Sequence, residues 1–138
     1  MKFLIALFSV LALNVAHAEM GTLESFFSPS MEKDHDHDKV VNLYLQNNCN
    51  QEIYVATRSQ NPNKVWETRG YHRIYPGQVV PAGSMINDIY YLNAFTGDRR
   101  VRWEGPHQFE IHGKTVRAAL VELPRDYGGN WTTVLYCY

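Results

Sequence analysis

The chain has 138 residues, of which 45% are hydrophobic and 20% are charged, with 13 Lys and Arg against 14 Asp and Glu. This length suits one compact domain with its own core, and the hydrophobic fraction is that of a globular chain. A net charge of −1 argues against a nucleic-acid-binding protein, because such a protein needs a strongly basic surface.

Residues 1–18 have the pattern of a secretory signal peptide. Lys2 precedes an apolar run from Phe3 to Val15, and Ala16-His17-Ala18 then places small residues at the two positions that a signal peptidase reads. The run is shorter than the about 20 apolar residues of a transmembrane helix, and no later segment approaches that length. The sequence therefore predicts cleavage before Glu19, a periplasmic or secreted product, and no membrane span after processing.

Residues 19–39 are expected to form a flexible acidic and His-containing linker, because their apolar content is low and their charge is dense. The end of this segment carries two imidazoles and three carboxylates, which are N and O ligands suited to Zn or Cu. In an extended segment both imidazoles project to one side and can reach one ion. A solvated linker without metal is the alternative, and weak Zn or Cu binding is the most that this pattern predicts. The five residues are Asp34, His35, Asp36, His37 and Asp38.

Residues 40–138 are expected to form a single β-rich domain. Apolar residues alternate with polar ones in short segments, as at Val41, Leu43 and Leu45, and turn signals such as Pro76-Gly77 and His112-Gly113 separate these segments. No segment has apolar residues at helical spacing over three turns. About eight strands at this spacing are typical of a small antiparallel β-sandwich or a partly open barrel.

Cys49 and Cys137 are the two cysteines of the chain, and in an exported protein they predict one disulfide. That bond would tie an early turn to the last strand of the domain. Two free thiols are the alternative. The sequence has no Cys-x-x-Cys pair, which argues against a thiol-redox enzyme.

Three arginines close to a tryptophan form a basic and aromatic arm that could hold a carboxylate, a phosphate or a glycan, because arginine presents a planar fork of donors. In the alternative interpretation, strand alternation alone exposes the arginines while the tryptophan packs inward. A Tyr-His pair after Gly70 completes the candidate ligand-binding set. The six residues are Tyr71, His72, Arg99, Arg100, Arg102 and Trp103.

An ordered set of short motifs runs through the first two-thirds of the domain. The motifs are Cys49-Asn50, Val55-Ala56, Trp66, Gly70-Tyr71, Ile74, Pro76-Gly77, Tyr90-Tyr91, Ala94, Trp103 and Gly105. In this pattern the chain resembles a bacterial family of small exported domains of unknown function. It departs from the family at Tyr71-His72, where a Trp pair is usual, and at Val79-Val80, where a Cys is usual. The resemblance implies a compact exported domain and supplies no catalytic residues.

These observations favour an exported, non-enzymatic binding or interaction module with an unknown ligand or an envelope or extracellular partner. A periplasmic metal-binding protein that uses the Asp and His residues of the linker is the second hypothesis. His72, His107 and His112 could each supply a general base, and the third hypothesis is a small hydrolase with His72 or His107 in that role. The sequence contains no nucleophile elbow, no His-Glu-x-x-His motif and no glycine-rich phosphate loop to support the third hypothesis.

Overall fold

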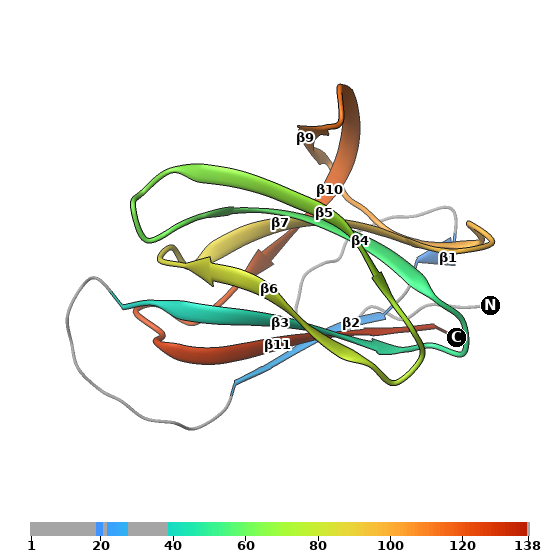
Figure 1. The fold of residues 1–138 in the computed structure, drawn as a ribbon, viewed down its shortest axis with the longest axis horizontal. Coiled ribbons are helices and arrows are strands. Elements are labelled where there is room, and N and C mark those ends of the chain that lie inside the picture. The colour runs from blue at the N-terminus through green and yellow to red at the C-terminus, as the bar shows by residue number, and fades with distance from the viewer. Residues whose placement is uncertain (1–18, 21, 28–38, 138) are drawn as a thin grey trace.

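The computed structural model describes residues 19–20, 22–27 and 39–137, with side chains from residue 39 onward. The strands are β1 (Glu19–Met20), β2 (Thr22–Phe27), β3 (Val41–Asn48), β4 (Ile53–Gln60), β5 (Trp66–Ile74), β6 (Val79–Met85), β7 (Ile89–Thr96), β8 (Val101–Trp103), β9 (His107–Ile111), β10 (Lys114–Glu122) and β11 (Gly129–Tyr136). The all-β fold class predicted from the alternating segments is confirmed (Figure 1). Among the described residues there is no helix that is long and apolar enough to cross a membrane.

The strands form two sheets that pack as two layers of a sandwich (Figure 1). The small sheet has four strands in the order β2-β11-β3-β6. In the seven-stranded large sheet, β7 pairs with β4 along one edge and with β10 and β8 along the other, while β5 follows β4. Most neighbours are antiparallel, as expected, but β3 with β11 and β1 with β8 are parallel pairs.

The core lies between the two sheets because, in the strands that form the two layers, every second residue points to the other layer. In β3, the buried apolar residues are Val41, Leu43 and Leu45, as their alternation with polar neighbours predicts, and the polar Asn47 is buried on the same face. Tyr90 of β7 is fully buried, and its hydroxyl forms a hydrogen bond with the hydroxyl of Thr133 in β11. The core therefore includes a polar link between the two layers.

Part of the expected linker is built into the sheets. β2 pairs with β11 from Phe27 opposite Trp131 to Thr22 opposite Tyr136, and β1 pairs with β8. The linker description does not hold for these two strands, because the edge of β11 offers backbone N–H and C=O groups that an extended segment can satisfy. Residues 28–38, which contain the five candidate metal ligands, lie outside the described residues.

Cys49 and Cys137 form the predicted disulfide, with a sulfur–sulfur distance of 2.06 Å and a Cα–Cα distance of 5.0 Å. The bond joins the turn after β3 to the residue after β11, and these strands are parallel neighbours in the small sheet. Cys49 is buried in the core. The disulfide therefore covalently closes one end of the sandwich.

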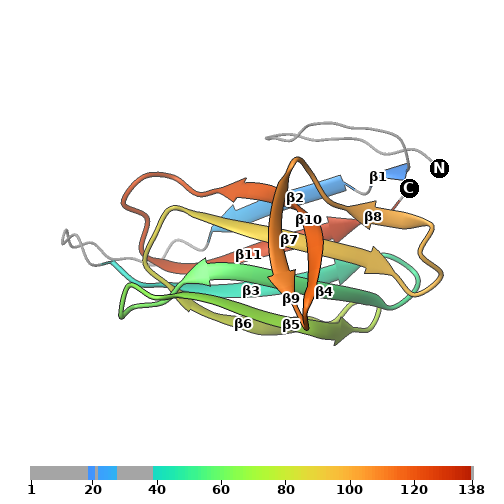
Figure 2. The ribbon, with the colours of Figure 1, turned by 90° about the horizontal axis from the view of Figure 1, so that it is seen from above.

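β10 belongs to two ladders, and this bends it out of the large sheet. Its first half, Lys114–Ala118, pairs with β9, whereas its second half, Ala119–Glu122, pairs with β7. The β9–β10 hairpin therefore crosses over β7, β4 and β5 on the side away from the small sheet (Figure 2). We call that side of the large sheet the outer face. The hairpin divides the outer face into two parts.

Candidate functional site

A row of four side chains crosses the outer face from β8 to β5. The ladder registers pair Arg102 with Phe95, Phe95 with Tyr54, and Tyr54 with Arg73, so four neighbouring strands each contribute one residue at the same level. Phe95 and Tyr54 both alternate with buried core residues, and their rings stack with centroids 5.6 Å apart. We call these four residues the Phe95 row. The row has a guanidinium at each end and two aromatic rings in the middle.

The β9–β10 hairpin is seated on the outer face beside this row. Ala56 points outward from β4 but is fully buried, because Phe109, Ile111 and Ala118 of the hairpin cover it. Gly70 of β5 also lies against Ala56, and an added Cβ at Gly70 would be 2.8 Å from the Ala56 Cα atom. This approach is too close for a side chain, so the glycine that precedes the Tyr-His pair is required by packing as well as by its φ of 130°.

Tyr71 is held where the hairpin meets the Phe95 row. Its hydroxyl donates to Asn93 Oδ1 at 2.8 Å, and Asn93 Nδ2 donates to the carbonyl of Arg117 in the hairpin at 2.7 Å. The Tyr71 ring lies 5.3 Å from the Phe95 ring between centroids. Burial raises the pKa of Tyr71, so its hydroxyl remains a protonated donor. Asn93, which is 7% exposed, thus fixes both the ring and the hairpin.

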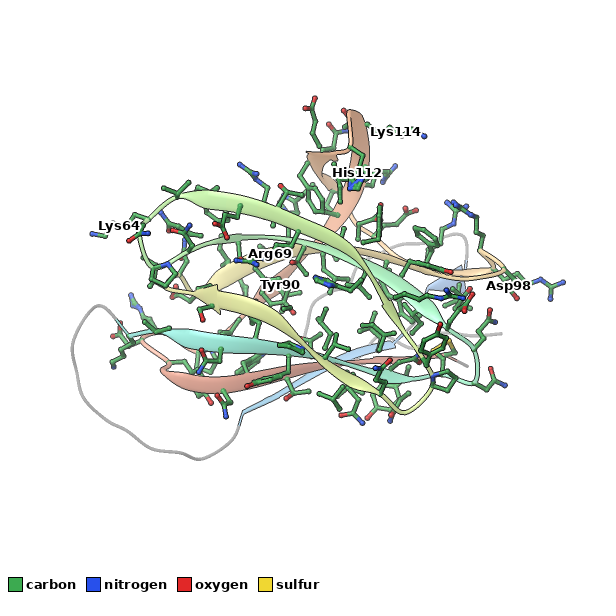
Figure 3. The ribbon with its side chains drawn as sticks, in the orientation of Figure 1. Lys64, Arg69, Tyr90, Asp98, His112 and Lys114 are labelled. Atoms are coloured by element: carbon green, nitrogen blue, oxygen red, sulfur yellow. A yellow bond between two sulfur atoms is a disulfide. The ribbon has the colours of Figure 1, made fainter. Side chains whose placement is uncertain are left out.

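The turn between β7 and β8 places Arg99 over the Phe95 ring. The Arg99 guanidinium carbon is 4.4 Å from the ring centroid, which is a cation–π distance. The Arg99 backbone has a φ of 62°, a left-handed conformation that is uncommon for residues other than Gly, Asn and Asp. Asp98 stabilises the turn by accepting from the Thr96 hydroxyl at 2.8 Å and from the backbone N–H of Arg100 at 3.0 Å (Figure 3). The turn therefore fixes the backbone of Arg99, and the cation–π contact places its guanidinium over the ring.

Positive charge is in excess at the Arg102 end of the row. At the other end, Arg73 donates to Glu52 Oε1 through Nε at 3.2 Å and Nη2 at 3.0 Å, and these hydrogen bonds lower the pKa of Glu52. The carboxylate of Asp98 is engaged by the neutral donors of its own turn, chiefly a backbone N–H, which lowers its pKa. Within residues 39–137, neither Arg99 nor Arg102 forms an ion pair with a carboxylate. Their guanidinium groups therefore keep donors for a ligand.

Three of the six predicted ligand-binding residues meet at this place. Tyr71 and Arg99 both contact the Phe95 ring, and Arg102 is the register partner of Phe95. The arginine arm and the residue after Gly70 are far apart in sequence, and the pairing of β4 with β5 and with β7 brings them together. These three residues therefore lie together as a basic and aromatic cluster, and ligand binding by this cluster stays a prediction.

Trp103 and His72 do not belong to that cluster. Trp103 is 1% exposed and packs in the core, as the strand-alternation alternative expected. His72 is the register partner of the buried Val55, so it points to the interior, while Tyr71 points to the outer face. Neighbours in a strand face opposite ways, and this rule separates the Tyr-His pair.

Arg100 lies apart from the Phe95 row as well. It lines a shallow depression of about 560 Å³ at the disulfide end of the sandwich, together with Asp98 and Gln51. Gln51 Nε2 donates to Asp98 Oδ2 at 3.2 Å across this depression. Its lining combines amide, carboxylate and guanidinium groups, so it is a polar surface beside the Cys49–Cys137 bond.

His72 is part of a polar group between β5 and β6, which are edge strands of the two sheets. Thr57 Oγ1, Arg69 Nε and His72 Nε2 are buried without a hydrogen-bond partner among the described residues. Arg69 lies between the layers (Figure 3), where Gly83 of β6 leaves room for its guanidinium, and it pairs with Glu67 at 2.6 Å. Burial, and then the charge of Arg69, lower the pKa of His72. The imidazole is therefore neutral at pH 7.

The histidines considered as general bases do not converge on one place. His72 faces the interior, whereas the exposed His107 packs against the Tyr91 ring with centroids 5.2 Å apart. His112 lies at the tip of the hairpin (Figure 3), where its Nε2 is 3.2 Å from the carbonyl oxygen of Gly70. In the part of the chain that the structure describes, no three His, Cys, Asp or Glu side chains form a metal-binding group.

A second aromatic group lies on the other side of the hairpin. The rings of Trp66 and Tyr91 have centroids 6.0 Å apart, and the guanidinium carbon of Arg58 is 5.9 Å from the Trp66 ring. Arg58 Nη1 donates to the Thr68 hydroxyl at 2.8 Å. This guanidinium also has no carboxylate partner among the described side chains, but it stands alone, whereas Arg99 and Arg102 both lie beside Phe95.

Sequence reasoning did not identify Phe95, Tyr54 or Arg73 as site residues. Alternation places each of them on a solvent-facing side of its strand, but only the registers of β4 with β5 and β7 show that they are neighbours. The turn residues Thr96-Gly97-Asp98 were the one local signal that linked Phe95 to the arginines.

Comparisons of the chain with protein-family models, with curated proteins and with solved structures found no match.

Proposed function

We propose that this protein is an exported, non-enzymatic binding module whose ligand contacts the outer face at the Phe95 row. The observation that carries the proposal is the pair of arginines, Arg99 and Arg102, which flank an aromatic ring without a carboxylate partner among the described residues. Such a site is suited to holding a ligand, because charged side chains without a protein partner surround a fixed aromatic ring. One fold hosts many functions, so this proposal rests on the chemistry of the site and not on the fold.

The site is also preorganised, which supports a binding role. The Asn93 side chain fixes Tyr71, and the hydrogen-bonded turn fixes Arg99 over Phe95. Fixed side chains lose little conformational entropy when a ligand binds. A left-handed backbone at a residue other than glycine costs of the order of 1 kcal/mol, and such conformations cluster at functional sites.

Export is the second part of the proposal, and two observations support it. The first 18 residues carry the charge, the apolar run and the small-x-small site of a signal peptide. The Cys49–Cys137 disulfide is compatible with an oxidising compartment, where such bonds persist. Both observations agree with a domain that acts in the periplasm or outside the cell.

The test compares the wild-type protein with matched arginine variants on an immobilised panel of envelope glycans, peptides and lipids. Arg102→Thr removes one guanidinium of the site, and Arg125→Ala removes an exposed guanidinium in the loop between β10 and β11. We expect at least one panel member to bind the wild type and Arg125→Ala equally and Arg102→Thr more weakly. Binding that all three proteins share, or no binding by the wild type, would refute the proposed site.

A further inference from the structure

We infer that the ligand of the Phe95 row is an acidic glycan, with a carboxylate at the Arg99 and Arg102 end and neutral hydroxyls toward Glu52 and Arg73. This inference rests on the proposed function, because it names the ligand class of the same site. It follows from the distribution of charge along the row, from the side-chain chemistry of a sheet face, and from the shape of the aromatic group.

The two ends of the row differ in charge. The guanidinium groups of Arg99 and Arg102 have no carboxylate partner among the described side chains, so this end suits one anionic group held by charge-assisted hydrogen bonds. At the other end, the Glu52 carboxylate accepts from Arg73 and, at 3.1 Å, from the Tyr54 hydroxyl. A carboxylate there disfavours a second anion but can accept hydrogen bonds from hydroxyl groups. The row therefore favours a ligand that is charged at one end only.

The length of the row also suits an oligomeric ligand. The four residues lie on four adjacent strands, from β8 through β7 and β4 to β5. Strands in a sheet are about 4.8 Å apart, so the row spans about 14 Å. A single acid group would fill only one end of that distance. A ligand that uses the whole row continues from its acid group into a neutral segment.

A sheet face favours a glycan over an extended peptide. The backbone groups of β4 and β7 that lie beneath the middle of the row are used within the ladders, so a ligand over these two strands meets side chains only. A peptide that binds to a sheet usually takes its affinity from the free backbone groups of an edge strand. A sugar ring has an apolar C–H face and hydroxyl edges. The Phe95 ring is stacked by Tyr54 and covered by the Arg99 guanidinium, so the C–H face of a sugar would pack along the edges of these rings. Its hydroxyls would meet the Glu52 carboxylate and the Tyr54 hydroxyl beside them.

The experiment measures binding of the full processed chain to hyaluronan oligosaccharides, in which acidic and neutral sugars alternate, by calorimetry at low salt. The matched probes are the same oligosaccharides with methyl-esterified carboxyl groups, polygalacturonate with an acid on every sugar, and poly-glutamate. We expect hyaluronan to bind best, and esterification to weaken binding at least tenfold, because it removes the partner of a charge-assisted hydrogen bond. Raising the salt concentration should weaken the acid-dependent part.

Two variants test the contribution of each end of the row. Arg99→Gly removes a guanidinium at a position whose left-handed backbone suits glycine, so the fold should be kept while hyaluronan binding falls about tenfold. Glu52→Gln removes the negative charge at the far end, and should raise affinity for polygalacturonate more than for hyaluronan. Circular dichroism of each variant checks that it is folded.

The outcomes separate this inference from the proposed function. The inference is overturned if hyaluronan does not bind, if the esterified probe binds as tightly as the acid, or if poly-glutamate binds better than any glycan. In those cases the binding site itself still stands when Arg102→Thr weakens another member of the panel. If no panel member distinguishes Arg102→Thr from Arg125→Ala, the proposed function fails together with the inference.

Discussion

Replacing Asn93 with alanine tests whether one buried amide holds the hairpin and the aromatic row together. The substitution removes the hydrogen bond from the Tyr71 hydroxyl at 2.8 Å and the hydrogen bond to the Arg117 carbonyl at 2.7 Å. Each such bond contributes about 1 kcal/mol net, and the carbonyl left beneath the hairpin adds a desolvation cost, so we expect a loss of about 2–3 kcal/mol. For a domain of this size the melting temperature should fall by roughly 10 °C.

The assay is thermal unfolding followed by circular dichroism, combined with limited proteolysis of the β9–β10 hairpin. Asn48→Ala is the matched control, because Asn48 is an exposed strand residue whose loss should change stability by less than about 0.5 kcal/mol. The hairpin of Asn93→Ala should be cleaved faster than the hairpin of the control. Equal melting temperatures and equal cleavage for the two variants would show that the hairpin is held by its apolar contacts alone.

Four further predictions concern other parts of the chain. Cys137→Ser should lower the free energy of unfolding by up to about 4–5 kcal/mol in the chain-entropy view, because the bond links residues 88 apart. Urea denaturation measures this loss, and an unchanged stability of the wild type after reduction of its disulfide would contradict it. Burial lowers the pKa of His72 below 6.5, so stability should fall as pH drops from about 6.5 through the folded pKa, and His72→Gln should flatten that decline in acid titrations of unfolding. The intact mass of the processed protein should match a chain that begins at Glu19. A mass that still includes Met1 would remove the basis for export. If the acidic linker binds Zn or Cu, calorimetry should show affinity that falls below about pH 6.5 and is lost when His35 and His37 are both alanine; unchanged binding would exclude them as ligands.

The sequence was sufficient for the fold class and for the covalent link. Alternation in β3 identifies Val41, Leu43 and Leu45 as core residues, because burial of one face of a strand imposes a period of two. The cysteine count, together with the predicted signal peptide, predicted the disulfide. These features depend on local pattern and on composition, which can be read from one chain.

The candidate site depends on information that local pattern does not contain. Phe95 and Tyr54 are neighbours because of the register between β4 and β7, and a shift of one residue would send one of them into the core. The outward-pointing Ala56 is buried only because β10 bends between its two ladders. The strand formed by residues 22–27 was missed because its pairing partner, β11, lies at the opposite end of the chain.

The pairing of β2 and β3 with β11 also constrains when the domain can fold. In the small sheet, the last strand lies between two of the earliest ones, and the second cysteine follows that last strand directly. Contacts between such distant segments form slowly, because a long loop must close before they contribute any stability. A chain that crosses a membrane with its N-terminus first would thus stay unfolded until its final residues have emerged. Folding would then occur in one step on the far side, where the cysteines can be oxidised.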